Sequence, residues 1–539
     1  MSARHIPSAP LSRRRLLALA GGASAAAAIG VAGCGSLSRE VSGELLASRS
    51  RLPEPFRVPL PVPRTAAPMR TERGVDHYEL VQRAAELEIL PGLRTEVWGY
   101  DGSFPGTTLV GRSGRQMVVT VRNELPVPTS THLHGGIQAP GSDGYPTDLV
   151  LPKGYRHDPA SGGKQGHGGH GGGMHVAAAD WKLSQGAKDY TYPLDQPAAT
   201  LWYHDHRMDF SAPQVWRGLA GMFLVRDDEE EALNLPSGER DIPLMICDRA
   251  FEEDGALRYP SVDPSLTGAP GVEDAYMEGV MGDVTLVNGV PWPELEVDAA
   301  RYRFRILNAS NARRYRLALE PGPREGASFV QVGSDAGLLG APRAHEALPV
   351  APAERFDVVV DFAAYPVGST VTLVNTLDEG GMRRVMRFRV ARPAKDDSRV
   401  PRKLADVEAL RAASAVAERR FDFRQTNAGD GSAVWTVNGK PFRSDAFAAR
   451  PRLGTVERWR FSSDFHHPVH LHLAHFQVVA RSGKAPLATD AGWKDTVDVR
   501  PFEVVDVLAR FSGHRGRYMF HCHNLEHEDM AMMANFQVV

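Results

Sequence analysis

The sequence predicts an all-β protein built from three consecutive copies of one β-sandwich, preceded by an export signal. Short runs of β-branched and aromatic residues recur between turn residues, as in all-β sandwiches; examples are residues 117–121, 303–306, 357–361 and 504–508. The chain of 539 residues contains 52 glycines and 39 prolines, which favours many turns over long helices. An Asn-Gly turn, an arginine-containing strand and a Phe-led strand follow one another at 286–289, 303–305 and 329–332, and again at 436–439, 459–461 and 476–479. A fainter relative lies at 114–121. Such echoes indicate duplicated units.

The N-terminal residues 1–33 form the predicted signal. Arg13, Arg14 and Arg15 precede a Gly/Ala-rich, weakly apolar run, which is typical of a Tat signal, the route that exports folded proteins. The run ends in Val-Ala-Gly-Cys34, which resembles a lipobox. We therefore expect cleavage before Cys34 and a lipid on its thiol; the alternatives are a plain signal peptide or an uncleaved anchor. The predicted location is extracytoplasmic, on the outer face of the cell membrane.

The repeats and composition divide the rest of the chain. The predicted parts are a Ser-, Pro- and Arg-rich tether at 34–70, sandwiches at 71–228, 240–394 and 420–539, and a charged, Ala-rich linker at 395–419. We expect the chain to be monomeric.

Composition excludes several classes of protein. Apolar residues make up 42% and charged residues 24%, which is ordinary for a globular protein and too apolar for a disordered one. The formal charge of −3 gives no reason to expect nucleic-acid binding. No stretch after residue 35 reaches the roughly 20 apolar residues of a transmembrane helix, so membrane contact is expected only through a lipid on Cys34.

The three cysteines leave no obvious disulfide framework. With Cys34 assigned to the lipid, Cys247 and Cys522 remain. Cys247 lies in a short apolar run and is interpreted as a buried strand cysteine. Cys522 has different neighbours.

Half of the twenty histidines fall in four tight clusters within the first and third sandwiches. The clusters are His132-Leu-His134, His204-Asp-His206, His467-Pro-Val-His470-Leu-His472 and His521-Cys-His523 with His527. A strand places residues i and i+2 on one face, so each His-x-His presents two imidazoles side by side. Neutral imidazole suits copper and zinc. One such pair is usually a surface or core feature, but four pairs together predict a metal centre.

The last cluster is the most specific. Cys522, His527 and Met532 are spaced by five and five, and a thiolate, imidazoles and a weak axial thioether are the ligands of a blue-copper site. His467 fits as the second imidazole, because Pro468 can set it apart from the two histidines that follow.

Strand geometry links this site to a second one. On one strand Cys522 points to one face, and His521 and His523 point to the other. A copper held by Cys522 is therefore joined by a short covalent path to the metal that the two histidines hold. Single electrons could pass along it.

With these motifs the sequence resembles the three-domain multicopper oxidases. It is most similar to the group of bacterial spore-coat laccases, bilirubin oxidases and phenoxazinone synthase. The resemblance covers about residues 50–539 and rests on the motifs at 98–106, 132–136, 142–146, 202–206, 302–305, 351–356 and the two histidine motifs of the third sandwich. It implies that the three sandwiches are cupredoxin-like Greek-key domains, the second being a spacer without copper ligands.

The resemblance also implies four coppers per chain, with the trinuclear cluster between the first and third domains. The type 1 ligands would be His467, Cys522, His527 and axial Met532. The type 2 ligands would be His132 and His470. The two type 3 coppers would be held by His134, His204 and His523, and by His206, His472 and His521.

Electron counting gives the implied reaction. Dioxygen takes up four electrons and four protons to become two waters, whereas a phenol or aromatic amine gives up one electron at a time. Asp143 and Glu528 match the acids that deliver protons in the family. For each, the alternative is a turn acid or a hydrogen bond to a ligand histidine.

His467 is the expected contact for the reductant, because its outer edge borders the surface in this fold. Phenols, aromatic amines or bilirubin-like pigments are expected by resemblance. The alternative is a metallo-oxidase acting on Cu(I) or Mn(II). Copper-detoxifying oxidases tend to carry a Met-rich insertion, whereas between His472 and His521 this chain has the single methionine Met519.

Other interpretations explain less. A scaffold protein would be expected to have lost ligands. A copper carrier needs only the type 1 set, and copper nitrite reductases typically have two domains per chain. The His- and Gly-rich segment at 164–175 could capture copper or be a solvated loop.

Overall fold

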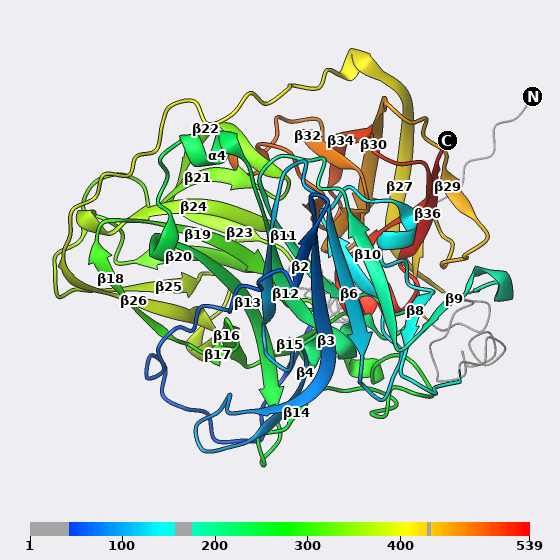
Figure 1. Ribbon diagram of the computed structural model, residues 1–539, viewed down its shortest axis with the longest axis horizontal. Coiled ribbons are helices and arrows are strands. Elements are labelled where there is room, and N and C mark those ends of the chain that lie inside the picture. Colours follow the sequence, from blue (N-terminus) through cyan, green and yellow to red (C-terminus); the bar gives the residue numbers. More distant parts are fainter. Residues whose placement is uncertain (1–42, 157–174, 428–432) are drawn as a thin grey trace, which may run out of the picture. The chain divides into compact units, whose positions relative to one another are not determined.

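Strands form nearly all of the regular structure, as the sequence predicts (Figure 1). The computed structural model describes residues 43–156, 175–427 and 433–539. The helices are short: α3 Ser211–Trp216, α4 Asp228–Ala232 and α5 Leu525–Asp529. Single 3-10 turns lie at Pro140–Ser142, Ala178–Asp180, Gly238–Arg240, Asp274–Tyr276, Phe362–Ala364, Gly380–Arg383, Ala412–Ser414 and Ala488–Asp490.

The first repeat contains two main sheets. One has the order β10-β6-β3-β2 with β4 also on β3: β2 Arg70–Glu72, β3 Val75–Leu87, β4 Thr95–Tyr100, β6 Met117–Asn123 and β10 Ala187–Tyr192. The other has the order β5-β12-β11-β7: β5 Gly106–Arg112, β7 Thr131–His134, β11 Ala199–Asp205 and β12 Ala220–Arg226. A small pair joins β8 Asp148–Leu151 to β9 Lys182–Gln185.

The second repeat also has two sheets. The larger has the order β17-β16-β13-β19-β24-β21-β22 with β14 on β13: β13 Asp241–Phe251, β14 Leu257–Arg258, β16 Val284–Val287, β17 Val290–Pro291, β19 Arg301–Asn308, β21 Phe329–Ser334, β22 Gly337–His345 and β24 Arg355–Asp361. The other has the order β18-β26-β25-β20-β23: β18 Glu294–Ala299, β20 Tyr315–Glu320, β23 Ala347–Val350, β25 Thr370–Asn375 and β26 Arg384–Pro393.

The third repeat follows the same plan. Its first sheet has the order β28-β27-β30-β34-β32: β27 Ala415–Asn427, β28 Ala433–Val437, β30 Thr455–Ser463, β32 His475–Arg481 and β34 Val504–Phe511. Its second sheet has the order β29-β36-β35-β31-β33: β29 Phe447–Ala449, β31 His467–Leu471, β33 Thr496–Val499, β35 Gly516–Cys522 and β36 Met533–Val538. All four strand runs singled out in the sequence lie within strands, in β6, β19, β24 and β34.

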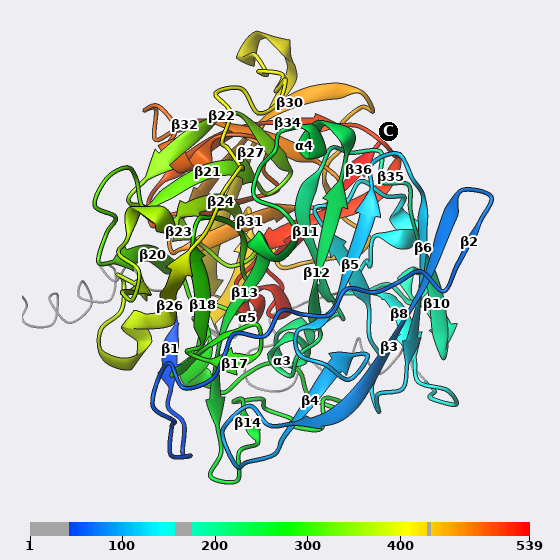
Figure 2. The ribbon, with the colours of Figure 1, turned by 60° about the vertical axis from the view of Figure 1, so that its left-hand side comes forward.

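Strand pairing shows the triplication directly. In one sheet of each repeat a first strand pairs in parallel with a later one: β3 with β6, β13 with β19, and β27 with β30. In the other sheet β5 pairs in parallel with β12, β18 with β26, and β29 with β36. Each repeat also has its own hydrophobic core, and Figure 2 shows the repeats from a second direction. The three predicted sandwiches are confirmed; their boundaries stay a prediction.

Alternation along the strands produces these cores. In β30 every second residue from Glu457 is buried, so Trp459 and Phe461 enter the core while the residues between them are partly exposed. Cys247 lies buried in β13, as the sequence predicts.

The tether prediction is wrong for the residues that the structure describes. Residues 44–46 form β1 Glu44–Leu46, which pairs in parallel with β15 Val280–Gly282. Leu46 is buried, and Leu60 packs into the core of the second repeat. Leu60 lies between Pro59 and Pro61, and these prolines do not prevent its burial. In addition, β27 begins at Ala415, inside the predicted linker.

Some predictions fall outside the described residues. These are the export signal, Cys34, and all of the 164–175 segment except His175. Among the described residues, no helix has the length and apolar character needed to cross a membrane.

Candidate metal centre

Four strands in two repeats position the clustered histidines. β7 pairs with β11, so His132 lies opposite His204, and β31 pairs with β35, so His470 lies opposite His521. The other clustered histidines lie on these strands or within two residues of their ends, except His527, which lies in α5. In the second repeat the corresponding strands β20 and β25 contain no histidine.

Eight imidazoles from the first and third repeats meet in one buried cluster. His132 stacks on His472 with ring centroids 3.8 Å apart, and His134 stacks on His470 at 3.6 Å. The other members are His204, His206, His521 and His523. All eight side chains are buried. The sequence predicted these eight residues as one site, and the fold brings all of them together.

Nitrogen lone pairs face one another inside this cluster. His472 donates its Nδ1–H to Asp143 Oδ2 over 2.8 Å, and His521 donates its Nδ1–H to the Cys522 carbonyl over 3.0 Å. Both Nε2 atoms are therefore bare acceptors in the neutral rings, yet they lie 3.3 Å apart. The Nε2 atoms of His132 and His470 lie 3.4 Å apart. They are also bare acceptors, because each ring donates its Nδ1–H to a backbone carbonyl. Facing lone pairs call for a cation.

Protonation does not supply that cation. Burial and the neighbouring imidazoles lower the pKa of His132, His472 and His523 well below the ordinary value, and burial lowers that of His204 to about 4. Nε2 of His204 and both ring nitrogens of His523 are buried without a hydrogen-bond partner. Neutral, converging imidazole nitrogens fit copper or zinc. The residues present therefore fit a metal cluster.

A second group holds a thiol. His467 Nδ1 lies 3.3 Å from Cys522 Sγ and 3.2 Å from His527 Nδ1, and Sγ lies 3.6 Å from His527 Nδ1. The far nitrogens of both rings are occupied, since His467 Nε2 donates to Asp464 over 3.2 Å and His527 Nε2 donates to the Glu278 carbonyl over 3.1 Å. Both Nδ1 lone pairs thus converge on the sulfur.

Two further features suit a thiolate–metal bond at this group. The Asn524 N–H donates to Cys522 Sγ over 3.4 Å, and Met532 is fully buried in the same core as Cys522. Burial raises the pKa of the Cys522 thiol well above its ordinary value, so a bound cation is needed to keep the sulfur as a thiolate. The His-Cys-His set with a nearby methionine fits copper.

Asp143 contacts the cluster from its own turn. Its carboxylate accepts from His472, and Gln138 Nε2 donates to its other oxygen over 2.9 Å. Its carbonyl accepts the His132 Nδ1–H. Burial raises the pKa of this carboxyl. A buried acid of this kind can hold a proton beside the cluster.

Glu528, in α5, contacts two other histidines of the cluster. One oxygen is 3.3 Å from His206 Nδ1 and the other is 3.1 Å from His521 Nδ1, and the side chain is buried. Both acids predicted from the sequence therefore contact histidines of the cluster.

The expected surface position of His467 is wrong. The side chain is 0% exposed, because Asp464 lies over its outer nitrogen, and Asp464 itself is 16% exposed. Trp435 stacks on His527 at 3.7 Å and meets His467 edge-on at 5.5 Å. Asp464, three residues before His467, was the local signal that sequence reasoning overlooked.

Asp495 contacts the cluster but was not predicted from the sequence. Its carboxylate is 3.0 Å from His134 Nε2 and its carbonyl accepts the His470 Nδ1–H over 2.9 Å. Arg355, from the second repeat, binds both of its oxygens, and both side chains are fully buried. No local pattern marks this residue, because its partners lie far away in the sequence.

The second repeat therefore reaches the metal centre without supplying a clustered histidine. Besides Arg355, it provides the Glu278 carbonyl to His527 and Arg314, which binds Asp498 and lies 3.2 Å from His466 Nε2. The second repeat, predicted to be a spacer, therefore positions residues at both the imidazole cluster and the thiol-containing group.

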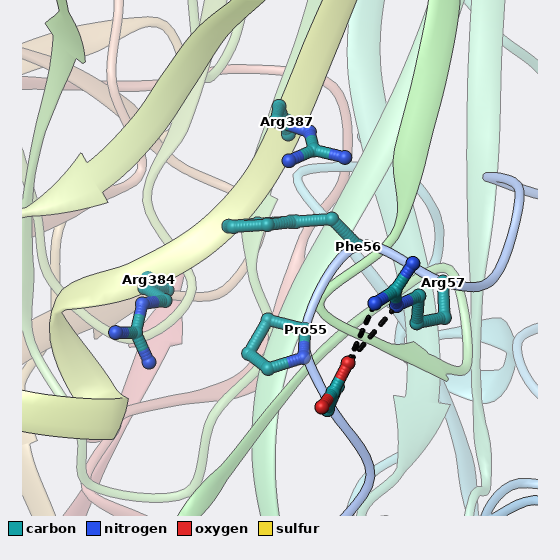
Figure 3. Close-up of a pocket in the computed structure, with 6 residues that line it drawn as sticks. Pro55, Phe56, Arg57, Arg384 and Arg387 are labelled. Carbon is teal, nitrogen blue, oxygen red and sulfur yellow. Dashed lines mark hydrogen bonds and ion pairs between the residues drawn. The ribbon is translucent and has the colours of Figure 1, made fainter.

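A surface pocket lies apart from these residues. It is lined by Glu54, Phe56, Arg57, Arg384 and Arg387 with Pro55, and Figure 3 shows Phe56 between the two arginines of β26. None of its lining residues is a histidine or cysteine, so the chemistry predicted from the sequence does not belong to it.

Comparison with known proteins gives consistent relatives. Profiles described as multicopper oxidase match residues 82–157 with 169–230, and residues 415–539. A laccase of Bacillus stratosphericus is 35% identical, and the match covers 90% of this chain and 99% of the relative. A bilirubin oxidase of Albifimbria verrucaria is 33% identical, and the match covers 89% of this chain and 81% of the relative. The crystal structure of a laccase from Pediococcus acidilactici is similar with a TM-score of 0.76 and 30% identity, covering 92% of this chain and 96% of that one.

Proposed function

This chain belongs to the multicopper oxidase family, and we propose that it is a laccase-like enzyme that couples four one-electron oxidations to the reduction of O2 to water. The substrates would be phenols, aromatic amines or bilirubin-like pigments. One observation carries the proposal: Cys522 of the thiol group lies between His521 and His523 of the eight-imidazole cluster on one chain segment. Electrons taken up at the first group have a bonded path to the second.

The geometry supports the proposed ligand sets most directly at three of the four copper positions. His467, Cys522 and His527 converge as a proposed type 1 set, and the backbone of Met532 hydrogen-bonds to Cys522 and His527. His206, His472 and His521 converge as a proposed type 3 set. His132 and His470 face each other as a type 2 pair. For the remaining type 3 set of His134, His204 and His523, the supporting observation is the unpartnered buried nitrogens at all three residues.

Copper supplies one-electron redox chemistry at each of these positions. The chain's own residues do the rest. Complete burial of the imidazoles excludes bulk water from the cluster. Asp143 fixes the His472 ring through Nδ1, and Asp495 fixes His470 and lies against His134. Asp143 and Glu528 contact Nδ1 atoms of the cluster histidines and are placed to hold protons beside the cluster.

The metallo-oxidase alternative is not favoured. The curated relatives described above are named laccase and bilirubin oxidase, and between His472 and His521 Met519 is fully buried. It is therefore not available as a surface site for Cu(I).

We also propose export through the Tat route, a lipid on Cys34 and a monomeric state. Export is supported by the arginines at 13–15, and lipidation by the lipobox-like residues 31–34. Export of the folded chain would allow copper insertion before translocation.

Oxygen uptake by copper-loaded protein tests the proposed substrate class. We expect 2,6-dimethoxyphenol and bilirubin to support faster oxygen uptake than Cu(I) or Mn(II) at equal concentrations. Fastest turnover with Cu(I) by a wide margin would favour the metallo-oxidase instead.

The two acids give a separate prediction. In Asp143→Asn and Glu528→Gln the amide keeps a hydrogen-bonding oxygen near the ring but no longer exchanges a proton, so we expect oxygen turnover to fall by roughly 100-fold. The rate at which the phenol reduces the type 1 copper without oxygen, monitored by stopped-flow absorbance, should stay unchanged. The copper content should also stay unchanged. Asp148→Asn is the matched control, at a buried acid of the same repeat as Asp143 that pairs with Lys188. Unchanged turnover in both variants would remove the acids from proton delivery.

A further inference from the structure

An unusual turn connects β33 to β34. Glu503 N–H donates to the Arg500 carbonyl over 3.0 Å, which closes a β-turn with Pro501 in its second position. The third position has φ 59° and is occupied by Phe502. A turn with positive φ at this position normally takes glycine or asparagine, because a side chain there is sterically strained.

Phe502 is also one of the most exposed large apolar side chains of the described residues, at 69%. A single exposed apolar residue is ordinary in a soluble protein. It is not ordinary for a bulky aromatic residue to have a strained backbone and an exposed side chain together. Glycine at this position would remove both the backbone strain and the exposed apolar surface. Retained strain of this kind points to a functional role.

The turn lies over the outer side of the thiol-containing group. Phe502 N–H donates to the Ser463 carbonyl over 2.9 Å, and the next residue, Asp464, accepts the hydrogen bond from His467 Nε2. The turn is fixed at both ends, because Val499 lies opposite His467 and Val504 lies opposite Ser462 in the flanking ladders. The backbone of Phe502 is therefore anchored to Ser463, the residue before Asp464, which covers His467.

We propose that Phe502 is the surface on which a planar aromatic reductant stacks before it gives its electron to the type 1 site. His467 is buried, so a donor must dock over Asp464 and its neighbours, and an aromatic ring fixed there offers a face to a phenol. His467, Cys522 and His527 would hold the copper that takes one electron from each phenol, and the proton of the phenol would pass to water. This inference rests on the proposed function and names a specificity-determining residue for it.

Steady-state kinetics of Phe502→Gly test the proposal. Glycine removes the ring and suits the positive φ, so the variant should fold with an unchanged or higher melting temperature. We expect the KM for 2,6-dimethoxyphenol to rise by about fivefold, in line with the loss of one aromatic stacking contact. The KM for ferrocyanide, a one-electron donor without an aromatic ring, should stay the same. Phe502→Trp should restore the KM for the phenol.

Two further measurements separate the outcomes. Saturation-transfer NMR with 1,2,3-trimethoxybenzene, which has no phenolic hydroxyl to oxidise, should show binding to the wild type and not to Phe502→Gly. Val367→Gly, at another exposed turn residue, is the control and should change neither donor's KM. An equal change for both donors, or no change for the phenol, would overturn the role of Phe502. Failure of the wild-type protein to oxidise ferrocyanide would instead contradict the proposed function.

Discussion

Replacing Cys522 by serine is expected to remove the type 1 copper and all oxidation of phenols while leaving the fold intact. A hydroxyl is a poor ligand for copper compared with a thiolate, and the two imidazoles of His467 and His527 would be left without the sulfur that completes their group. The substitution is nearly isosteric, and the Asn524 N–H can donate to the new oxygen as it does to the sulfur. Copper analysis should give about three metals per chain instead of four, and the rate of phenol oxidation should equal the background rate.

Cys247→Ser is the matched control. Cys247 is likewise buried in a strand, but it belongs to none of the metal-binding groups of the described residues. We expect this variant to keep four coppers and full activity. Phenol oxidation that survives in Cys522→Ser, or that is lost equally in Cys247→Ser, would contradict electron uptake through Cys522.

Replacing Asp495 by alanine is expected to destabilise the protein and weaken copper binding together. Burial alone would raise the pKa of this carboxyl, but Arg355 and His134 hold it well below its ordinary value, so it is charged in the folded state. Its removal leaves the Arg355 guanidinium fully buried with Asp335 3.8 Å away as the remaining acid in contact. Breaking a buried ion pair in this way costs about 3–5 kcal/mol of unfolding free energy. Loss of a residue that positions metal ligands typically lowers metal affinity about 10–100-fold.

A double variant separates these two effects. Asp495→Ala combined with Arg355→Met removes both charges, so most of the unfolding free energy of the apoprotein should return, as measured by urea denaturation. Copper affinity should remain low, because His134 has still lost its carboxylate neighbour. Copper affinity that recovers with stability would show that Asp495 acts only through the fold.

The charge of Asp495 also predicts the direction in which stability changes with pH. A carboxyl whose pKa is depressed in the folded state stabilises the protein above the unfolded pKa of about 4 and loses that contribution as the pH falls. Wild-type apoprotein should therefore lose stability on acidification below about pH 4 more steeply than Asp495→Ala.

Local patterns in the sequence were sufficient to predict the sandwiches and the histidine clusters, and the family resemblance assigned these clusters to one centre. The period of two along strands placed His132 beside His134 and set Cys522 against its neighbours, and these depend on residues close in the chain. Asp495 and Arg355 could not be predicted in the same way, because they meet across two repeats and neither lies in a repeated pattern. The burial of His467 also escaped prediction, since it depends on how the 463–465 segment folds over the ring.

The proline-rich segment before residue 70 shows a different limit. Its composition is typical of a linker, and it contains few residues that could form a core alone. Leu46 and Leu60 nevertheless pack, because the other repeats provide the apolar surface that they cover. The composition of a segment indicates how much apolar surface it can bury by itself. It does not indicate how much apolar surface of neighbouring parts of the chain it can cover.

In the proposed reaction, electrons from a type 1 copper would reach a cluster that reduces O2 fully to water. The most direct test is the stoichiometry of the reaction, measured with an oxygen electrode and a known amount of ferrocyanide, with catalase added at the end. We expect four ferrocyanide ions to be oxidised per O2 consumed, with no return of oxygen after catalase. A ratio of two, with oxygen returned by catalase, would show that peroxide is released and would contradict the proposed reaction.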